Sequence, residues 1–218
     1  MIINHNHKAY LERWNRLGPD RYNGAFYYSQ EICENIIPKV NTDRNWLTVD
    51  WPGEKPFDHA IAFVHHNLNT HWYADWKGKD VVLVCGLPET VFKMQQFGNA
   101  VYLPLSVNVK YLQRFKNNIK QRDVCFAGRP DKITDQVPDG VDILTGLPRE
   151  QFLTELAKYR HCFAVGRVAL ECLALGVEVL PYDPRFPDPT RWKLMDNAEA
   201  ARKLNQILKE VDGGDKQR

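Results

Sequence analysis

The feature that most constrains the fold of this chain is an alternation of short apolar runs with amphipathic, helix-like stretches. The apolar runs are GAFYY, WLTVD, AIAFV, DVVLVC, AVYLP, DVCFAG, VDILTG, HCFAV and VEVLPY. The helix-like stretches between them include SQEICENIIPKV, PETVFKMQQFG, PREQFLTELAKY and RVALECLALG. Strands that alternate with helices form parallel sheets covered on both faces. The sequence therefore predicts an α/β fold with parallel, Rossmann-like βαβ sheets.

The length of the chain, 218 residues, allows one large domain or two small ones. A predicted strand ends at Leu103-Pro104, and a short irregular piece then leads to a new helix near Asn108. We therefore expect two lobes, a minimal N-terminal lobe of residues 1–104 and a second lobe of residues 105–218 that ends in the helix NAEAARKLNQILKEV.

The composition indicates a globular protein and shows no pattern typical of a metal site or a membrane helix. Hydrophobic residues make up 44% and charged residues 26%, and the formal net charge of +2 is too small to indicate a polyanion partner by itself. The five cysteines are spaced singly, without the pairing of a zinc site, so we expect reduced thiols and no bound metal. The N-terminus lacks a signal-peptide pattern and no apolar run is long enough for a membrane helix, so we expect a cytoplasmic protein.

The stretch FAVGRVALECLALG predicts a strand, a turn and a helix. Phe163 to Val165 form the end of the strand, Gly166 allows a tight turn, and the helix begins at about Arg167 and ends at Gly176. A helix N-terminus at the carboxyl end of a parallel strand favours a phosphate, because it presents backbone N–H groups and the positive end of the helix dipole. The guanidinium of Arg167 adds a fixed charge there.

Glu171 lies four residues after Arg167 and therefore on the same face of the predicted helix. Two interpretations follow. The carboxylate could accept hydrogen bonds from a ribose diol while Arg167 and the turn hold phosphates. Alternatively, the two side chains form an ordinary ion pair one helical turn apart, worth about 0.2 to 0.5 kcal/mol on an exposed helix.

The segment VGRVALECLALGVEVL resembles the donor-binding half of GT-B-fold glycosyltransferases, which carries a strand, a glycine-containing loop and a helix with a nucleotide-contacting glutamate. The passage YLPLSVNVKYLQRF is similar to the crossing between the two domains in that family, and the resemblance covers residues 102–183. It implies that Glu171 holds the ribose and that Gly166 and Arg167 face the diphosphate of the donor.

Two further segments are similar to the same family. VCFAGRPDK looks like its strand with a Gly-Arg pair and a nearby lysine, which implies that Gly128, Arg129 and Lys132 contact the diphosphate; a surface turn is the alternative for this segment. ILTGLPREQFLTELAKY looks like its base-side loop and helix, which implies that Thr145 and Gly146 shape the base pocket. A simple strand-to-helix turn explains these two residues as well.

The resemblance implies transfer of a sugar from a nucleotide-diphosphate donor, a UDP-sugar above all, to an acceptor hydroxyl on a glycan, a small molecule or a modified nucleic acid, without a metal or another cofactor. Many retaining members carry a second glutamate eight positions before the ribose glutamate, where this chain has Phe163, so retention and inversion both stay open. The alternatives are a nucleotide-sugar epimerase or hydrolase, and a module that binds a nucleotide-sugar without turnover.

Residues expected on the acceptor side follow predicted strands of the first lobe. His65 and His66 come directly after AIAFV, where either imidazole could act as a general base; a histidine with only loop hydrogen bonds is the alternative. Ser29 follows GAFYY and Gly86 follows DVVLVC, and each is either an acceptor contact or a helix cap or turn.

A basic stretch follows the predicted boundary between the lobes. It contains Lys110, Arg114, Lys116, Lys120 and Arg122 without an acidic residue, on a predicted helix whose apolar stripe is Leu112, Phe115 and Ile119. The two interpretations are a solvated helix face and a surface that contacts the phosphates of a polyanionic acceptor such as DNA.

Overall fold

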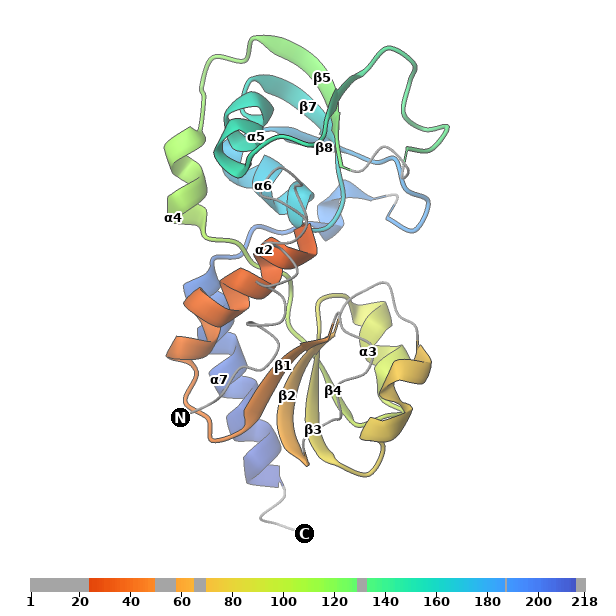
Figure 1. Ribbon diagram of the computed structural model, residues 1–218, viewed down its shortest axis with the longest axis vertical. Helices are drawn as coiled ribbons and strands as arrows, with labels where there is room; N and C mark the ends of the chain where they lie inside the picture. Colours follow the sequence, from red (N-terminus) through yellow and green to blue (C-terminus); the bar gives the residue numbers. More distant parts are fainter. Residues whose placement is uncertain (1–23, 50–57, 65–69, 129–132, 187, 215–218) are drawn as a thin grey trace. The chain divides into compact units, whose positions relative to one another are not determined.

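The computed structural model describes residues 24–49, 58–64, 70–128, 133–186 and 188–214. Within this range the chain forms two compact units, each built on a four-stranded parallel sheet with helices between the strands (Figure 1). The predicted α/β fold with two Rossmann-like lobes is confirmed.

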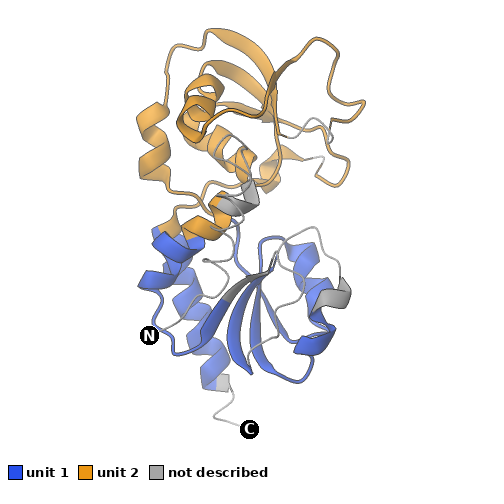
Figure 2. Cartoon of the chain, in the orientation of Figure 1, with its two compact units in different colours: residues 1–12, 32–105, 198–218 blue, residues 13–31, 106–197 orange. Residues whose placement is uncertain are grey.

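The units are discontinuous in sequence, unlike the predicted lobes. The first unit draws its described residues from 32–105 and 198–218, and the second draws them from 13–31 and 106–197 (Figure 2). The last helix, α7 (Asn197–Gly214), therefore belongs to the first unit from Ala198 onward. Hydrogen bonds attach it there, since Asn205 Oδ1 accepts from the N–H of Asn41 at 2.7 Å and Asn205 Nδ2 donates to the carbonyl of Lys39 at 2.9 Å.

The sheet of the first unit has the strand order β1-β2-β3-β4. A π-helical turn, η1 (Ile32–Ile36), and a 3₁₀ turn, η2 (Ile37–Lys39), precede it. The strands and connecting helices are β1 (Asn45–Val49), β2 (His59–Val64), η3 (Thr70–Trp76), β3 (Asp80–Cys85), α3 (Pro88–Met94) and β4 (Asn99–Tyr102).

The two middle strands of this sheet, β2 and β3, are apolar on both faces. Every side chain from Ala60 to Val64 and from Val81 to Cys85 is buried, which is the pattern of a parallel strand covered on both sides. On one face, Tyr73 and Trp76 of η3 and Met94 of α3 pack against these strands. The apolar runs AIAFV and DVVLVC are thus strands for the reason that the sequence indicated.

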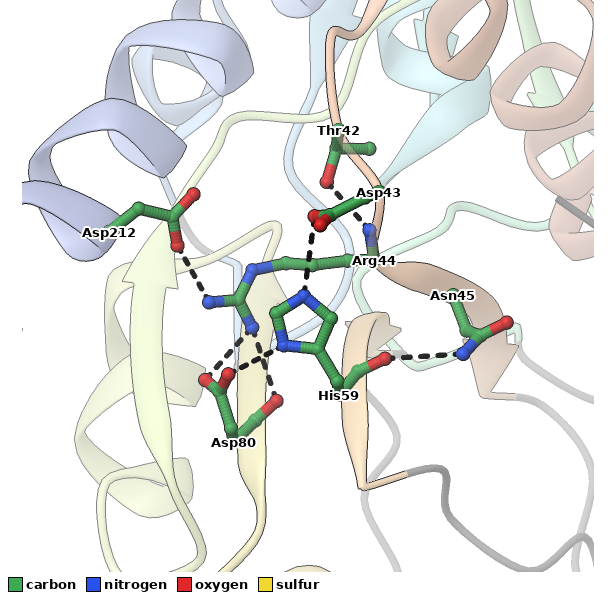
Figure 3. A network of polar contacts seen from close by, with 7 residues as sticks. All are labelled: Thr42, Asp43, Arg44, Asn45, His59, Asp80 and Asp212. Carbon is green, nitrogen blue, oxygen red and sulfur yellow. Dashed lines mark hydrogen bonds and ion pairs between the residues drawn. The ribbon is translucent and has the colours of Figure 1, made fainter. Parts of the chain in front are cut away.

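A polar network lies at the amino-terminal edge of the same sheet (Figure 3). The guanidinium of Arg44, which is 2% exposed, donates to Asp80 Oδ1 at 2.9 Å and to Asp212 Oδ1 of α7 at 2.7 Å. His59 Nδ1 lies 2.6 Å from Asp80 Oδ2, and its Nε2 lies 3.3 Å from Asp43 Oδ1. Arg44 therefore joins the first residue of β3 to the end of α7 within one unit.

The sheet of the second unit has the strand order β6-β5-β7-β8. Helix α2 (Gly24–Glu31) lies far earlier in the sequence, and α4 (Val109–Leu112) with η4 (Gln113–Phe115) leads into the sheet. The remaining elements are β5 (Arg122–Ala127), β6 (Asp142–Leu144), α5 (Arg149–Leu156), β7 (Tyr159–Phe163), α6 (Arg167–Leu175), β8 (Glu178–Leu180) and the 3₁₀ turn η6 (Pro189–Arg191).

Helix α6 begins and ends at glycines, as the sequence predicted. Gly166 is its N-cap with φ of 61°, and Gly176 follows its last turn with φ of 67°. The N–H of Gly176 donates to Leu173 and that of Val177 to Cys172, which is the Schellman arrangement of a helix end. Both glycines lie in the positive-φ region that side chains with a Cβ rarely adopt.

The prediction of a strand over GAFYY is wrong, because these residues belong to helix α2. Aromatic residues favour strands only weakly, and tertiary packing overrides that preference. Here α2 packs against α6 and buries Ser29 and Glu31. Ser29 therefore lies within a helix of the second unit and not at the end of a strand of the first.

The Arg44 network predicts an acid-sensitive contribution to the stability of the first unit. Burial works to raise the pKa of Asp80, but hydrogen bonds from Arg44 and His59 outweigh it and the pKa is lowered. A lowered pKa adds stability that is complete above the unfolded-state value of about 3.9 and is lost as the pH falls through the folded-state value. Because the Asp80 side chain is half exposed, we expect Asp80→Asn to lower the free energy of unfolding by only about 1 kcal/mol at pH 7.

Urea unfolding of both proteins at pH 7 and at about pH 2.5 checks this, since the difference should shrink at the lower pH. Asp75→Asn, which removes an exposed carboxylate of η3, serves as the control and should change little at either pH. An Asp80→Asn difference of the same size at both pH values would contradict the assignment.

Candidate functional site

The strand order of the second unit reverses between β5 and β7. From β5 the chain moves to β6 on one side of the sheet, and it then returns to β7 and β8 on the other side. In open α/β sheets, ligands bind outside the carboxyl ends of the strands at such a point, because the two following loops leave in opposite directions. The candidate site is therefore the carboxyl edge of β5 and β7.

Three predicted donor segments lie at this one edge. Gly128 directly follows β5, Thr145 and Gly146 directly follow β6, and Gly166 lies between β7 and α6. All four strands of the sheet run parallel, so the three segments leave the sheet on the same side. Gly128 is half-buried, Thr145 and Gly146 are exposed, and Gly146 has φ of 67°.

The turn at Gly166 leaves room next to the start of α6. Apart from Gly166 itself and its two chain neighbours, no heavy atom of the described residues lies within 4 Å of the place where a Cβ on Gly166 would be. As an N-cap, Gly166 supplies no side chain to the first N–H groups of the helix. An α-helix makes no internal partner for those groups, and together with the helix dipole they form a suitable anion site.

A buried network of two arginines and two glutamates lies within this unit beside that turn. Glu171 Oε1 accepts from Arg167 Nε and from Arg149 Nη2, each at 2.7 Å. Arg167 Nη2 donates to Glu31 Oε1 of α2 at 2.8 Å. The side chain of Arg167 is 5% exposed and that of Glu171 is fully buried. The pair expected four residues apart thus forms, but in the interior and with two further charged partners.

Because this network is buried, each of its charges has lost hydration that its partners must replace. Desolvating a charge costs several kcal/mol, and only close partners and hydrogen bonds offset that cost. The positive charges of Arg149 and Arg167 match the negative charges of Glu31 and Glu171. The network therefore fixes the first turn of α6 to the first turn of α5 and to α2, which lie far apart in sequence.

Two tyrosines of the second unit lie beside arginines, one of which is Arg149 of this network. The guanidinium of Arg149 stacks on the ring of Tyr27 at 4.7 Å, and that of Arg114 lies 5.6 Å from the ring of Tyr111. Burial raises the pKa of both phenols, so both are neutral hydrogen-bonding groups at pH 7. Aromatic and guanidinium planes of this kind can stack on a nucleobase.

The sequence interpretation missed Arg149, Glu31 and Tyr27. Arg149 could have been found, because it is the first residue of the helix after the predicted base-side loop, and helix starts that follow parallel strands gather at one edge of a sheet. Glu31 and Tyr27 carry no such signal. Both lie more than a hundred residues before Arg167, and Tyr27 lies in the run GAFYY, which was predicted as a strand.

Several predicted residues lie apart from this arrangement or outside the described residues. The structure does not describe Arg129, Lys132, His65 or His66. In the sequence, the two histidines follow Val64, the last residue of β2. Gly86 follows β3 in the first unit, where a Cβ would meet the Leu105 side chain at 2.8 Å. The close approach of Leu105 is a packing reason for glycine at this position.

The basic helix is shorter than the sequence predicted. Helical structure ends at Phe115, so Ile119, which is 75% exposed, does not continue an apolar stripe. Lys120 Nζ instead donates to the carbonyls of Ala157 at 3.0 Å and Leu175 at 3.1 Å, at the ends of α5 and α6. A cation there satisfies terminal carbonyls and complements two helix dipoles, which is a structural role.

Metal ions, membranes and known relatives place few constraints on the candidate site. Over the described ranges, no group of three His, Cys, Asp or Glu side chains is placed to hold a metal ion. In the same ranges, no helix has both the length and the apolar character needed to cross a membrane. Comparison of the sequence with protein-family models and with curated proteins finds no match.

The buried network makes a prediction about stability. Glu171→Gln removes the carboxylate that lies between two buried guanidiniums, so we expect the free energy of unfolding to fall by about 3 to 5 kcal/mol. Glu178→Gln, on a side chain that is 70% exposed in the same unit, is the matched control and should change it by less than about 0.5 kcal/mol. Urea unfolding followed by circular dichroism measures both. A loss below about 1 kcal/mol for Glu171→Gln would show that the network does not hold the unit together.

Proposed function

We propose that this protein is a glycosyltransferase that moves a sugar from a nucleotide-diphosphate donor, a UDP-sugar above all, to an acceptor hydroxyl. The observation that carries the proposal is the meeting of Gly128, Thr145-Gly146 and Gly166 at the carboxyl edge of one parallel sheet, at its switch point. These are the segments for which the resemblance to GT-B-fold glycosyltransferases implies donor contacts.

In this proposal the diphosphate binds at the start of α6, between the loops after β5 and β7. The N–H groups of the first turn and the helix dipole stabilise the charge that grows on the leaving diphosphate, which is a large term in catalysis when the groups are fixed in advance. The buried network supplies the fixing, because Arg167 and Glu171 hold this turn and Arg149 holds the base-side loop beside it.

The roles of the other residues follow from their places. A ribose diol that bonds to Glu171 would have to exchange for one of its arginine contacts, since that carboxylate is fully buried. Tyr27 and Tyr111 are the proposed stacking surface for the base. His65 or His66 is the proposed general base toward the acceptor.

We place the reaction in the cytoplasm, because all five cysteines are free thiols.

A second candidate function, binding of a nucleotide-sugar without turnover, is favoured by one observation. Arg167 and Glu171 already have charged partners within the protein. Such a pair can shape a pocket and take no part in a reaction. A binding module and a transferase differ in one measurable product, the nucleoside diphosphate that only the transferase releases.

Thermal unfolding with UDP, GDP, ADP, TDP and their sugars tests the donor site. A nucleotide at about 100 times its dissociation constant adds roughly 2.7 kcal/mol, which should raise the melting temperature by about 5 to 10 °C. The sugar form of the nucleotide that shifts the melting temperature is then incubated with acceptor candidates, and release of nucleoside diphosphate is measured. A chain that no nucleotide stabilises would refute the donor site, and binding without release would favour the second candidate.

A charge placed at the proposed diphosphate position should weaken nucleotide binding without unfolding the protein. Gly128→Glu puts a carboxylate at the carboxyl end of β5, where repulsion should weaken binding by about 10-fold or more. Gln121→Glu adds the same charge on an exposed residue just before β5, at the opposite edge of the sheet, and is the control. Titration calorimetry gives both affinities. Equal affinities in the two variants would show that the diphosphate does not bind at the carboxyl edge of this sheet.

A further inference from the structure

The chain passes between the two units at three places within the described residues. The passages lie between residues 31 and 32, 105 and 106, and 197 and 198. On the side of the second unit, the residues at these passages are Glu31, Ser106 and Asn197. All three are polar and all three are buried. Burying a polar side chain costs free energy unless the side chain is hydrogen-bonded, so hydrogen bonds are expected at each of the three passages.

Hydrogen bonds join the three passages to one another inside the second unit. Ser106 Oγ donates to Asn197 Oδ1 at 2.8 Å, and Asn197 Nδ2 donates to Glu31 Oε2. The second and third passages are also joined by their backbones. The N–H of Val107 donates to the carbonyl of Met195 at 3.1 Å, and the N–H of Asn197 donates to that of Val107 at 3.2 Å.

Glu31 is what attaches the first passage to the other two. Its Oε2 accepts from Asn197, and its Oε1 accepts a long hydrogen bond, 3.4 Å, from the N–H of Asn108. The same Oε1 accepts from Arg167 Nη2 at 2.8 Å. One carboxylate therefore contacts the segment after the second passage, the segment before the third passage and the first residue of α6.

We propose that Glu31 is a clamp that gathers the three connections into a single pivot on the second unit. With the clamp in place, the units can move relative to each other only about one point. Without it, the first connection swings independently of the other two, which remain joined by their backbone hydrogen bonds. The inference stands apart from the proposed catalytic function, since it rests on the connections alone.

The test measures the distance between the units directly in the full-length protein. Spin labels are attached to Phe92→Cys in the first unit and Ile119→Cys in the second, both at exposed positions, in a Cys33→Ser background. The remaining four cysteines are buried. Electron–electron double resonance then gives the distribution of distances for the protein with and without Glu31→Gln.

We expect Glu31→Gln to widen this distribution at least about twofold and to speed hydrogen exchange at the N–H of Asn108 about tenfold. Asp80→Asn is the matched control, since it also removes a carboxylate partner of a buried arginine but lies within the first unit. It should leave both readouts unchanged.

A distribution for Glu31→Gln as narrow as that of the parent, or an equal widening in Asp80→Asn, would overturn the proposal. If Glu31→Gln does not fold, Asn197→Ala decides the question. It removes the hydrogen bond from Asn197 to Glu31 Oε2, and it leaves the contact of Glu31 with Arg167 and the backbone hydrogen bonds between the other two passages in place. A smaller widening in Asn197→Ala supports the clamp, and an unchanged width refutes it.

Discussion

The second unit depends on the burial of Arg167. A guanidinium cannot be deprotonated at any pH that a folded protein tolerates, so its burial is costly unless close carboxylates and hydrogen-bond acceptors offset the lost hydration. Glu171 supplies one from the next turn of the same helix, and Glu31 supplies the other from α2. Because Glu171 also accepts from Arg149, this single requirement ties three helix segments together at the edge of the sheet where its strand order reverses.

The same requirement links the candidate site to the chain connections. Glu31 serves both, since one of its oxygens contacts Arg167 and the other contacts Asn197. A displacement of Arg167 at the start of α6 would therefore alter the contacts of Glu31 with the segments that lead out of the unit. Fixed charges behind a helix N-terminus are also what electrostatic catalysis needs, because groups already in place cost no reorganisation when charge develops.

Local sequence patterns predicted most of the fold, because burial of short apolar runs and the backbone freedom of glycine depend mainly on neighbouring residues. The apolar runs from Ala60 to Val64 and from Val81 to Cys85 predicted buried strands, and Gly166 and Gly176 marked the ends of α6 correctly. The strand predicted over GAFYY failed because its aromatic residues are as compatible with a packed helix as with a strand. The basic helix failed because Lys120 is used to complete the ends of α5 and α6, which no local pattern indicates.

The sequence by itself determined the α/β class, the strands of both sheets, the caps of α6 and the position of Arg167 and Glu171 on one helix face, all of which follow from residues close together in the chain. Only the tertiary structure decided that these two side chains form a buried pair, that Arg149 and Glu31 complete it, and that α7 belongs to the first unit. The physical reason is that desolvation depends on every segment packed around a charge. Glu31 is separated from Arg167 by 136 residues, and nothing in either local sequence encodes their meeting.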